Sequence, residues 1–268
     1  MTYQKLLFHL GHYQIQITNA ADLSSYSRKS YTCDLRQFQK FLSSFPPNIE
    51  IDSFPQLLNS YLQRLMHAER LKSSTIKRRF ITLHKFFNSL EASCSISDNP
   101  FRSFTCKTNR EYTLPKVLQK QELISLISAV KKDLANQNGY HALIAARNLA
   151  IIDLLICTGM RIGEISLLRL QDYQASTNTL LIRGKGQKER ILFISSSEVV
   201  QELSNWIRLR PLLNPHCNLL FINKYGYAIS IYGIENIFYK YRKLSNITPE
   251  ATPHYLRHTF ASVDTFAA

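Results

Sequence analysis

The chain has 268 residues, of which 45% are hydrophobic, enough for one large domain or two ordinary domains with real cores. Lysine and arginine number 33 against 19 aspartate and glutamate residues, and the net charge of +14 indicates an anionic partner: nucleic acid first, an anionic membrane surface second. The five cysteines are scattered without a C-x-x-C pair, which argues against a disulfide framework and a structural metal site.

No uninterrupted apolar run in the sequence reaches the length of a membrane span. The opening segment, MTYQKLLFHLGHYQIQI, is broken by polar residues and lacks the pattern of a signal peptide. We therefore expect a cytoplasmic protein with no membrane partner.

The front part of the chain has helical periodicity. Residues 1–20 are treated as an N-terminal extension, and residues 21–104 are predicted to form an all-helical domain. Apolar residues at helical spacing predict three helices in it, over 24–45, 57–65 and 73–91. Ser74 is the expected N-cap of the third helix.

Basic residues gather on this third helix and just before it. They are Arg70, Lys72, Lys77, Arg78, Arg79 and Lys85. A basic helix face is more often merely solvated, but few acids accompany this one and the whole chain is basic. We therefore predict that these residues contact DNA phosphates.

The helical region is followed by FRSFTCKTNREYTLP, a basic stretch without sustained periodicity. We place a linker at 105–115 and a second domain at 116–268. In the second domain, patterning predicts helices over 118–134, 142–158, 196–213 and 231–245, strands over 179–183 and 190–194, and a short strand or extended piece at 219–223. Trp206 is expected in the core and Ser230 as an N-cap. The predicted fold class is mainly α, α+β: a helical domain, then a mixed, mostly helical domain with a small antiparallel sheet.

The segment TGMRIGEISLLRLQDYQASTNTLLIRGKGQKERILFI carries three charged residues in distinctive places. Gly159 ends the apolar helix, so Arg161 lies at a corner between two helices, with Glu164 one turn later. Lys185 lies between two glycines in the polar turn that joins the two predicted strands, where it can approach a ligand closely. Taken singly, each feature is typical of a solvated turn or a surface ion pair.

A further cluster occurs in TPHYLRHTFAS. Pro253 is favourable in a first helical turn, and from there His254, Arg257 and His258 fall on one helix face. The alternatives are two structural histidines or an i, i+4 metal pair. No acidic or cysteine ligand accompanies them, so zinc is not expected.

In order and spacing, TGMRIGEISLLRLQDY, IRGKGQKERILFI and TPHYLRHTFAS resemble the three core motifs of the tyrosine recombinases, also called the phage integrase family. His258 matches a histidine common in the third motif, which we interpret as structural. The helical front part and basic linker resemble, more weakly, the family's core-binding domain, which closes over DNA opposite the catalytic domain. The resemblance implies cleavage and rejoining of duplex DNA through a phosphotyrosyl intermediate, with no metal or cofactor. It also implies self-association, or assembly with an intact recombinase, on DNA.

The resemblance implies a role for each motif residue. Arg161 and Arg257 clamp the non-bridging oxygens of the phosphate, because guanidinium groups stay charged and bind bidentately. Lys185 protonates the leaving 5′ oxygen, and His254 exchanges the proton of the tyrosine. Glu164 matches an acidic position that orients the cationic groups.

The sequence departs from the family after Arg257, because only 11 residues follow it and none is a tyrosine. The family continues through a second histidine or tryptophan to the nucleophilic tyrosine. We therefore expect a C-terminally truncated copy that does not cleave DNA by itself. The type IB topoisomerases use similar chemistry, but the short length and front domain look more like an integrase.

Three interpretations stay open. The chain is a recombinase truncated by a frameshift or gene disruption, a non-catalytic DNA-binding remnant or competitor of an intact recombinase, or a basic helical protein for membrane or acidic-protein contact. The last would not need Arg161, Lys185, His254 and Arg257 together.

Overall fold

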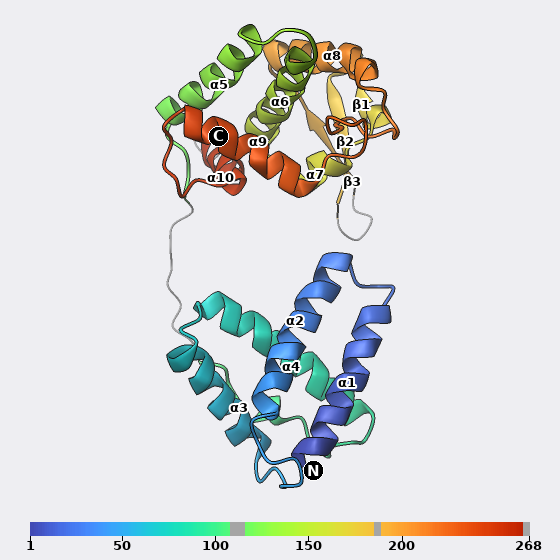
Figure 1. Ribbon diagram of the computed structural model, residues 1–268, viewed down its shortest axis with the longest axis vertical. Coiled ribbons are helices and arrows are strands. Elements are labelled where there is room, and N and C mark those ends of the chain that lie inside the picture. The colour runs from blue at the N-terminus through green and yellow to red at the C-terminus, as the bar shows by residue number, and fades with distance from the viewer. Residues whose placement is uncertain (108–115, 185–188, 265–268) are drawn as a thin grey trace. The chain divides into compact units, whose positions relative to one another are not determined.

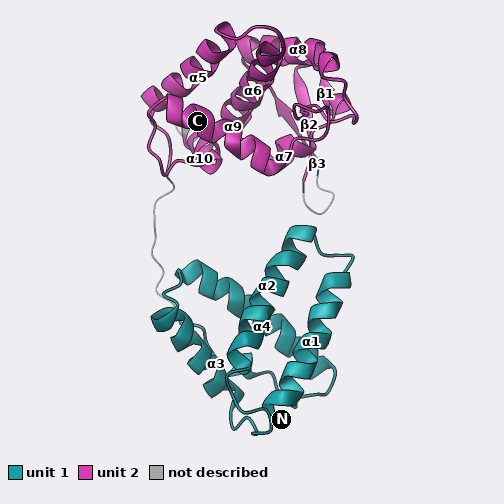
Figure 2. Cartoon of the chain, viewed as in Figure 1, with its two compact units in different colours: residues 1–112 teal, residues 113–268 magenta. Residues whose placement is uncertain are grey.

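The computed structural model describes residues 1–107, 116–184 and 189–264. The chain divides into two compact units, Met1–Tyr112 and Thr113–Ala268 (Figure 2). Each unit has its own hydrophobic core. The division falls inside the segment 105–115, where the sequence analysis places a linker.

The regular elements among the described residues of unit 1 are helices, apart from an isolated bridge between Thr2 and Glu50. Its elements are α1 (Tyr3–Asn19), α2 (Ser25–Leu42), α3 (Phe54–Gln63), a π-helical turn (Arg64–Ala68), α4 (Ser73–Ala92) and a 3-10 turn (Pro100–Arg102). The second, third and fourth helices match the three that were predicted. At the start of α4 the N-cap position is Lys72, so the prediction of Ser74 as the N-cap is wrong.

The first helix was not predicted, because residues 1–20 were treated as an extension. They form α1, which packs against α2 and α4 (Figure 1). Leu6, Leu10 and Ile17 are buried in the core of the unit. These residues lie four and seven positions apart, which is helical spacing, and the polar residues that interrupt the run lie on the remaining surface of the helix.

Unit 2 combines helices with a three-stranded antiparallel sheet of order β1-β2-β3 (Figure 1). Its elements are α5 (Lys120–Ala135), α6 (Gly139–Thr158), α7 (Ile162–Leu167), β1 (Tyr173–Gln174), β2 (Thr179–Arg183), β3 (Glu189–Phe193), α8 (Ser197–Leu209), α9 (Ile231–Leu244) and α10 (Pro253–Asp264), with 3-10 turns at Leu170–Asp172 and Arg210–Leu213. The predicted fold class is confirmed. Residues 219–223 form isolated bridges rather than a strand.

The core of unit 2 surrounds α6, which packs against α5, α8, α9 and α10. By length and composition α6 could cross a membrane, although the sequence analysis found no uninterrupted apolar run of that length, and 67% of its apolar window is buried inside the unit. The predicted core position of Trp206 is confirmed, because its ring is fully buried and its Nε1–H donates to the Leu220 carbonyl at 3.0 Å. Ser230 caps α9 as predicted by accepting from the Gly233 N–H at 3.0 Å.

Candidate functional site

The candidate site begins where α6 ends. Gly159 closes this helix in the left-handed conformation, with φ of 57°. A Cβ at this position would come within 2.5 Å of the Phe260 ring of α10, so glycine is required for both backbone and space. The Gly159 carbonyl accepts a hydrogen bond from Arg257 Nη1 at 2.5 Å. This contact fixes Arg257 of α10 against the corner that leads into α7.

Glu164 is the carboxylate around which the neighbouring arginines are arranged. It accepts from the Arg161 N–H at 2.9 Å and from Arg161 Nη1 at 3.1 Å. Arg190 of β3 binds both of its oxygens, at 3.0 and 2.8 Å. Burial by itself raises the pKa of Glu164, but the hydrogen bonds from Arg190 and Arg161 outweigh it and lower the pKa to about 2. The carboxylate is therefore charged at any physiological pH.

Arg161, His254 and Arg257 line one small surface hollow, together with the apolar residues Met160, Ile162 and Pro253. The Arg161 side chain is 57% exposed, and His254 is exposed as well. The pKa of Arg257 is lowered, first by partial burial and then by the positive charges of Arg161 and Arg190. We call Arg161, Arg190 and Arg257 with Glu164 the arginine cluster. The cluster has three guanidinium groups and one carboxylate, which is hydrogen-bonded to Arg161 and Arg190, so positive charge is in excess there and suits an anion such as a phosphodiester.

The structure brings together four of the residues singled out from the sequence, namely Arg161, Glu164, His254 and Arg257. Lys185 lies outside the described residues. His258, interpreted as structural, has an exposed side chain, so packing does not account for it.

Sequence analysis missed Arg190 as a member of the site. A signal for it exists, because Arg190 pairs with Ile182 across β2 and β3 and lies on the same face of the sheet as this buried residue. A charged residue on the inner face of a strand needs a buried partner, which here is Glu164.

The cations predicted to contact DNA from unit 1 differ in their availability. Arg70, Lys72, Arg78 and Lys85 are exposed, and Lys77 is half-buried. Lys85 Nζ donates to the Tyr31 hydroxyl at 2.9 Å and lies over the Tyr31 ring. The Arg79 side chain is only 12% exposed and pairs with Glu69 at 3.2 Å, so it is the least available of these cations to a DNA phosphate.

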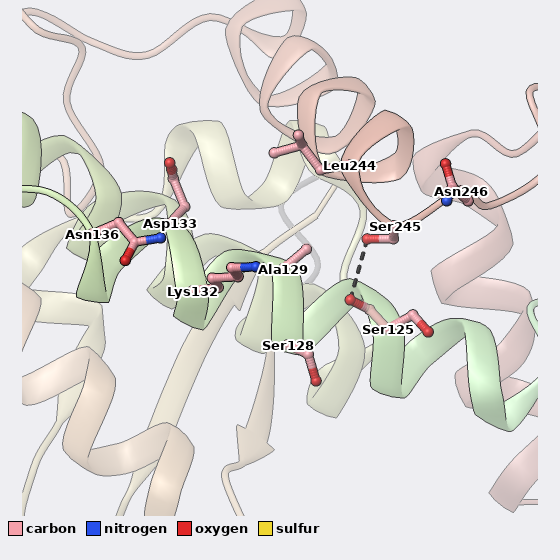
Figure 3. A pocket seen from close by; sticks show the side chains of 9 residues that line it. All are labelled: Ser125, Ser128, Ala129, Lys132, Asp133, Asn136, Leu244, Ser245 and Asn246. Carbon is pink, nitrogen blue, oxygen red and sulfur yellow. Dashed lines mark hydrogen bonds between the residues drawn. The ribbon is translucent and has the colours of Figure 1, made fainter.

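A larger hollow lies between α5 and α9 (Figure 3). Small polar side chains line much of it, and the Ser245 hydroxyl donates to the Ser125 carbonyl at 3.2 Å across it. It contains none of the motif residues. Within the described ranges, no group of three histidine, cysteine or acidic side chains is placed to hold a metal ion. Of these two hollows, the one beside the arginine cluster is therefore the one lined by motif residues.

The fold of the chain is that of solved site-specific recombinases. It matches the XerH site-specific recombinase in its post-cleavage complex with palindromic difH substrate, with a TM-score of 0.79 and 21% identity over 98% of this chain and 85% of that one. Lambda integrase bound to DNA matches with a TM-score of 0.69 and 15% identity, over 100% of this chain and 90% of that one.

Sequence comparisons agree with the fold. The family model described as Phage integrase family matches residues 116–263, and the Phage integrase, N-terminal SAM-like domain matches residues 10–93. A tyrosine recombinase of Agathobacter rectalis is 32% identical over 235 residues, which cover 87% of this chain and 75% of the relative. Tyrosine recombinase XerC of Thermodesulfovibrio yellowstonii is 29% identical over 245 residues, 89% and 76% of the two chains. The chain belongs to the phage integrase family, and the resemblance stated from its motifs is confirmed.

Proposed function

We propose that this chain is a site-specific DNA recombinase of the tyrosine type, and that its arginine cluster holds the phosphodiester at which strands are exchanged. The observation that supports this most directly is the charge balance of the cluster. Arg161 and Arg257 line a hollow with His254, and the one carboxylate among them, Glu164, is shared with Arg190. A phosphodiester bound there would neutralise the excess positive charge of the arginines.

The proposed roles follow from the contacts of each group. Arg161 and Arg257 would bind the non-bridging oxygens, since a guanidinium group donates two parallel hydrogen bonds and stays charged. His254, exposed at the rim of the hollow, would take and return a proton, and Lys185 would protonate the leaving oxygen. Glu164 and the Gly159 carbonyl would orient the two arginines before DNA arrives.

The attacking oxygen must come from a tyrosine, and the 268 residues contain none after Tyr255. Tyr255 is itself buried, with 9% of its surface exposed. We therefore propose that these residues alone bind DNA without cleaving it, because the cluster cannot replace the nucleophile. On DNA they would then compete with, or assemble beside, an intact recombinase.

DNA binding is tested by mobility shift of the 268-residue chain on duplex DNA at increasing salt. We expect the affinity to fall steeply with salt, because lysine and arginine displace condensed counterions. No binding at low salt, or an affinity that is independent of salt, would contradict the proposed function. The same samples, incubated with a nicked duplex, should contain no denaturation-resistant protein–DNA adduct.

A further inference from the structure

Asp34 of α2 is a buried carboxylate at the contact between α2 and α4. It is 2% exposed. Its Oδ2 accepts from the Thr82 hydroxyl at 3.0 Å and from Arg78 Nη1. Its Oδ1 is buried and has no partner among the described residues. A buried carboxylate with an unsatisfied oxygen costs stability, so its presence calls for a benefit elsewhere.

The other partner of this contact, the guanidinium group of Arg78, reaches the surface. The side chain of Arg78 is 44% exposed, whereas that of Asp34 is 1% exposed. A guanidinium group has five N–H donors, and in the described part of the chain Arg78 uses only Nη1. Asp34 is held in turn by Thr82, one helical turn after Arg78. The exposed guanidinium is therefore tied along one edge to a rigid helix pair, while its other donors stay open to solvent.

The neighbouring cations are not held in this way. Arg79 pairs with Glu69 but is largely buried, so its contact serves packing. Lys77 has no hydrogen bond from its ammonium group to any described residue. A lysine of this kind is a mobile point charge, which suffices for a phosphate because a phosphate presents oxygens in many directions. A phosphate contact alone gives no reason to bury a carboxylate behind Arg78.

We propose that Asp34 is a positioning residue, which holds the Arg78 guanidinium for a bidentate contact with a guanine in the DNA site. This inference rests on the proposed function, since it requires that unit 1 binds duplex DNA. A guanidinium reads guanine through two parallel hydrogen bonds to O6 and N7, and this geometry depends on the plane of the group. Asp34 thus affects which sequence is chosen more than how tightly DNA is held.

The test is selection of preferred sites from a duplex library with randomised positions, carried out with the full 268-residue chain. Wild-type protein should enrich a G·C pair at one position, with a preference of roughly tenfold or more over the other pairs. Arg78→Lys keeps the charge but not the fork, so it should lose this preference and keep most of its affinity. Asp34→Asn, which preserves shape and an acceptor for Thr82, should flatten the preference at the same position. In the Arg78→Lys background, Asp34→Asn should change it no further.

Two controls separate this role from a merely structural one. Lys77→Ala should weaken binding to all sequences alike and leave the preferred site unchanged. Leu35→Ala, next to Asp34 and fully buried, should lower the stability of unit 1 without altering base preference. The inference is overturned if wild-type protein binds DNA without such a preference, or if either Asp34→Asn or Arg78→Lys leaves the preference unchanged. Failure of the wild-type chain to bind any duplex at low salt would instead contradict the proposed function.

Discussion

One carboxylate in each unit is hydrogen-bonded to arginine, and in each the balance between burial and these hydrogen bonds sets the direction of the pKa shift. Glu164 in unit 2 has hydrogen bonds from two arginines, and these outweigh burial and lower its pKa to about 2. Asp34 in unit 1 has Arg78 as its one hydrogen-bonded cation, and that arginine is partly exposed. There burial is the larger effect and raises the pKa of Asp34, although Thr82 and Arg78 act against it.

This difference fits two uses of the same contact. In unit 2 a firmly charged Glu164 collects Arg161 and Arg190 beside Arg257, so positive charge converges on one hollow. In unit 1 one arginine, Arg78, is paired with one acid, Asp34, so the charges balance and the effect of the contact is to orient the guanidinium group. The first arrangement suits a phosphate that undergoes chemistry, and the second suits the reading of a base.

The largest stability effect is expected at a third carboxylate, which has no arginine partner among the described residues. Asp153 of α6 is 5% exposed, and burial raises its pKa to about 7, with Lys131 acting weakly against this. Because the folded-state pKa is raised, the contribution of Asp153 to stability is present below pH 4 and is lost as pH rises through about 7. Asp153→Asn should therefore stabilise unit 2 at pH 8, by up to about 4 kcal/mol, and have little effect at pH 4.

Denaturant unfolding followed by fluorescence of Trp206 measures this, since it is the one tryptophan of the chain and lies in the core of unit 2. Glu198→Gln, which removes an exposed partner of Lys131, serves as the control and should change stability little. A variant of Asp153 that is equally destabilised at both pH values would contradict the assignment.

The next effect, of opposite sign, is expected at Glu164. Its lowered pKa means that the carboxylate stabilises the fold above its unfolded pKa near 4.5, and that this contribution is lost as pH falls toward 2. Glu164→Gln should lower the free energy of unfolding by about 3 kcal/mol at pH 7. The same Trp206 signal should show the difference between variant and wild type closing between pH 4.5 and 2. A constant difference across that range would mean that packing, not charge, is lost.

The smallest effect is expected at Asp34. Because burial raises its folded-state pKa, charging Asp34 costs stability, and wild-type unit 1 loses stability relative to Asp34→Asn as pH rises from the unfolded pKa of 3.8 through the raised folded-state pKa. Hydrogen exchange of the amide groups in α2 and α4 would follow this without interference from unit 2. If Asp34→Asn becomes less stable relative to wild type over that pH range, the Arg78 contact outweighs burial and the contrast with Glu164 disappears.

From the sequence we could predict the fold class, the elements that hold the motifs and four members of the site, because these depend on local periodicity, on Gly159 and on short motifs. It could not supply the contacts that orient the arginines. Arg190 binds Glu164 across 26 positions and Arg78 binds Asp34 across 44. Strand alternation can place Arg190 on the inner face of the sheet, but a single sequence does not say which residues pair at such separations. The helix α1 was missed for a different reason, since polar residues obscured its apolar spacing.

The central claim is that the arginine cluster holds a phosphodiester and that the 268 residues by themselves supply no tyrosine to attack it. The most direct measurement appends a C-terminal segment carrying a tyrosine to the 268 residues and follows denaturation-resistant adduct formation on a nicked duplex. We predict an adduct with the extended chain, none with the 268 residues alone, and a loss of about 10²–10³-fold in rate for Arg257→Ala but not for Arg208→Ala, an exposed arginine of α8. An adduct formed by the 268 residues alone, or one that Arg257→Ala leaves unchanged, would contradict the claim.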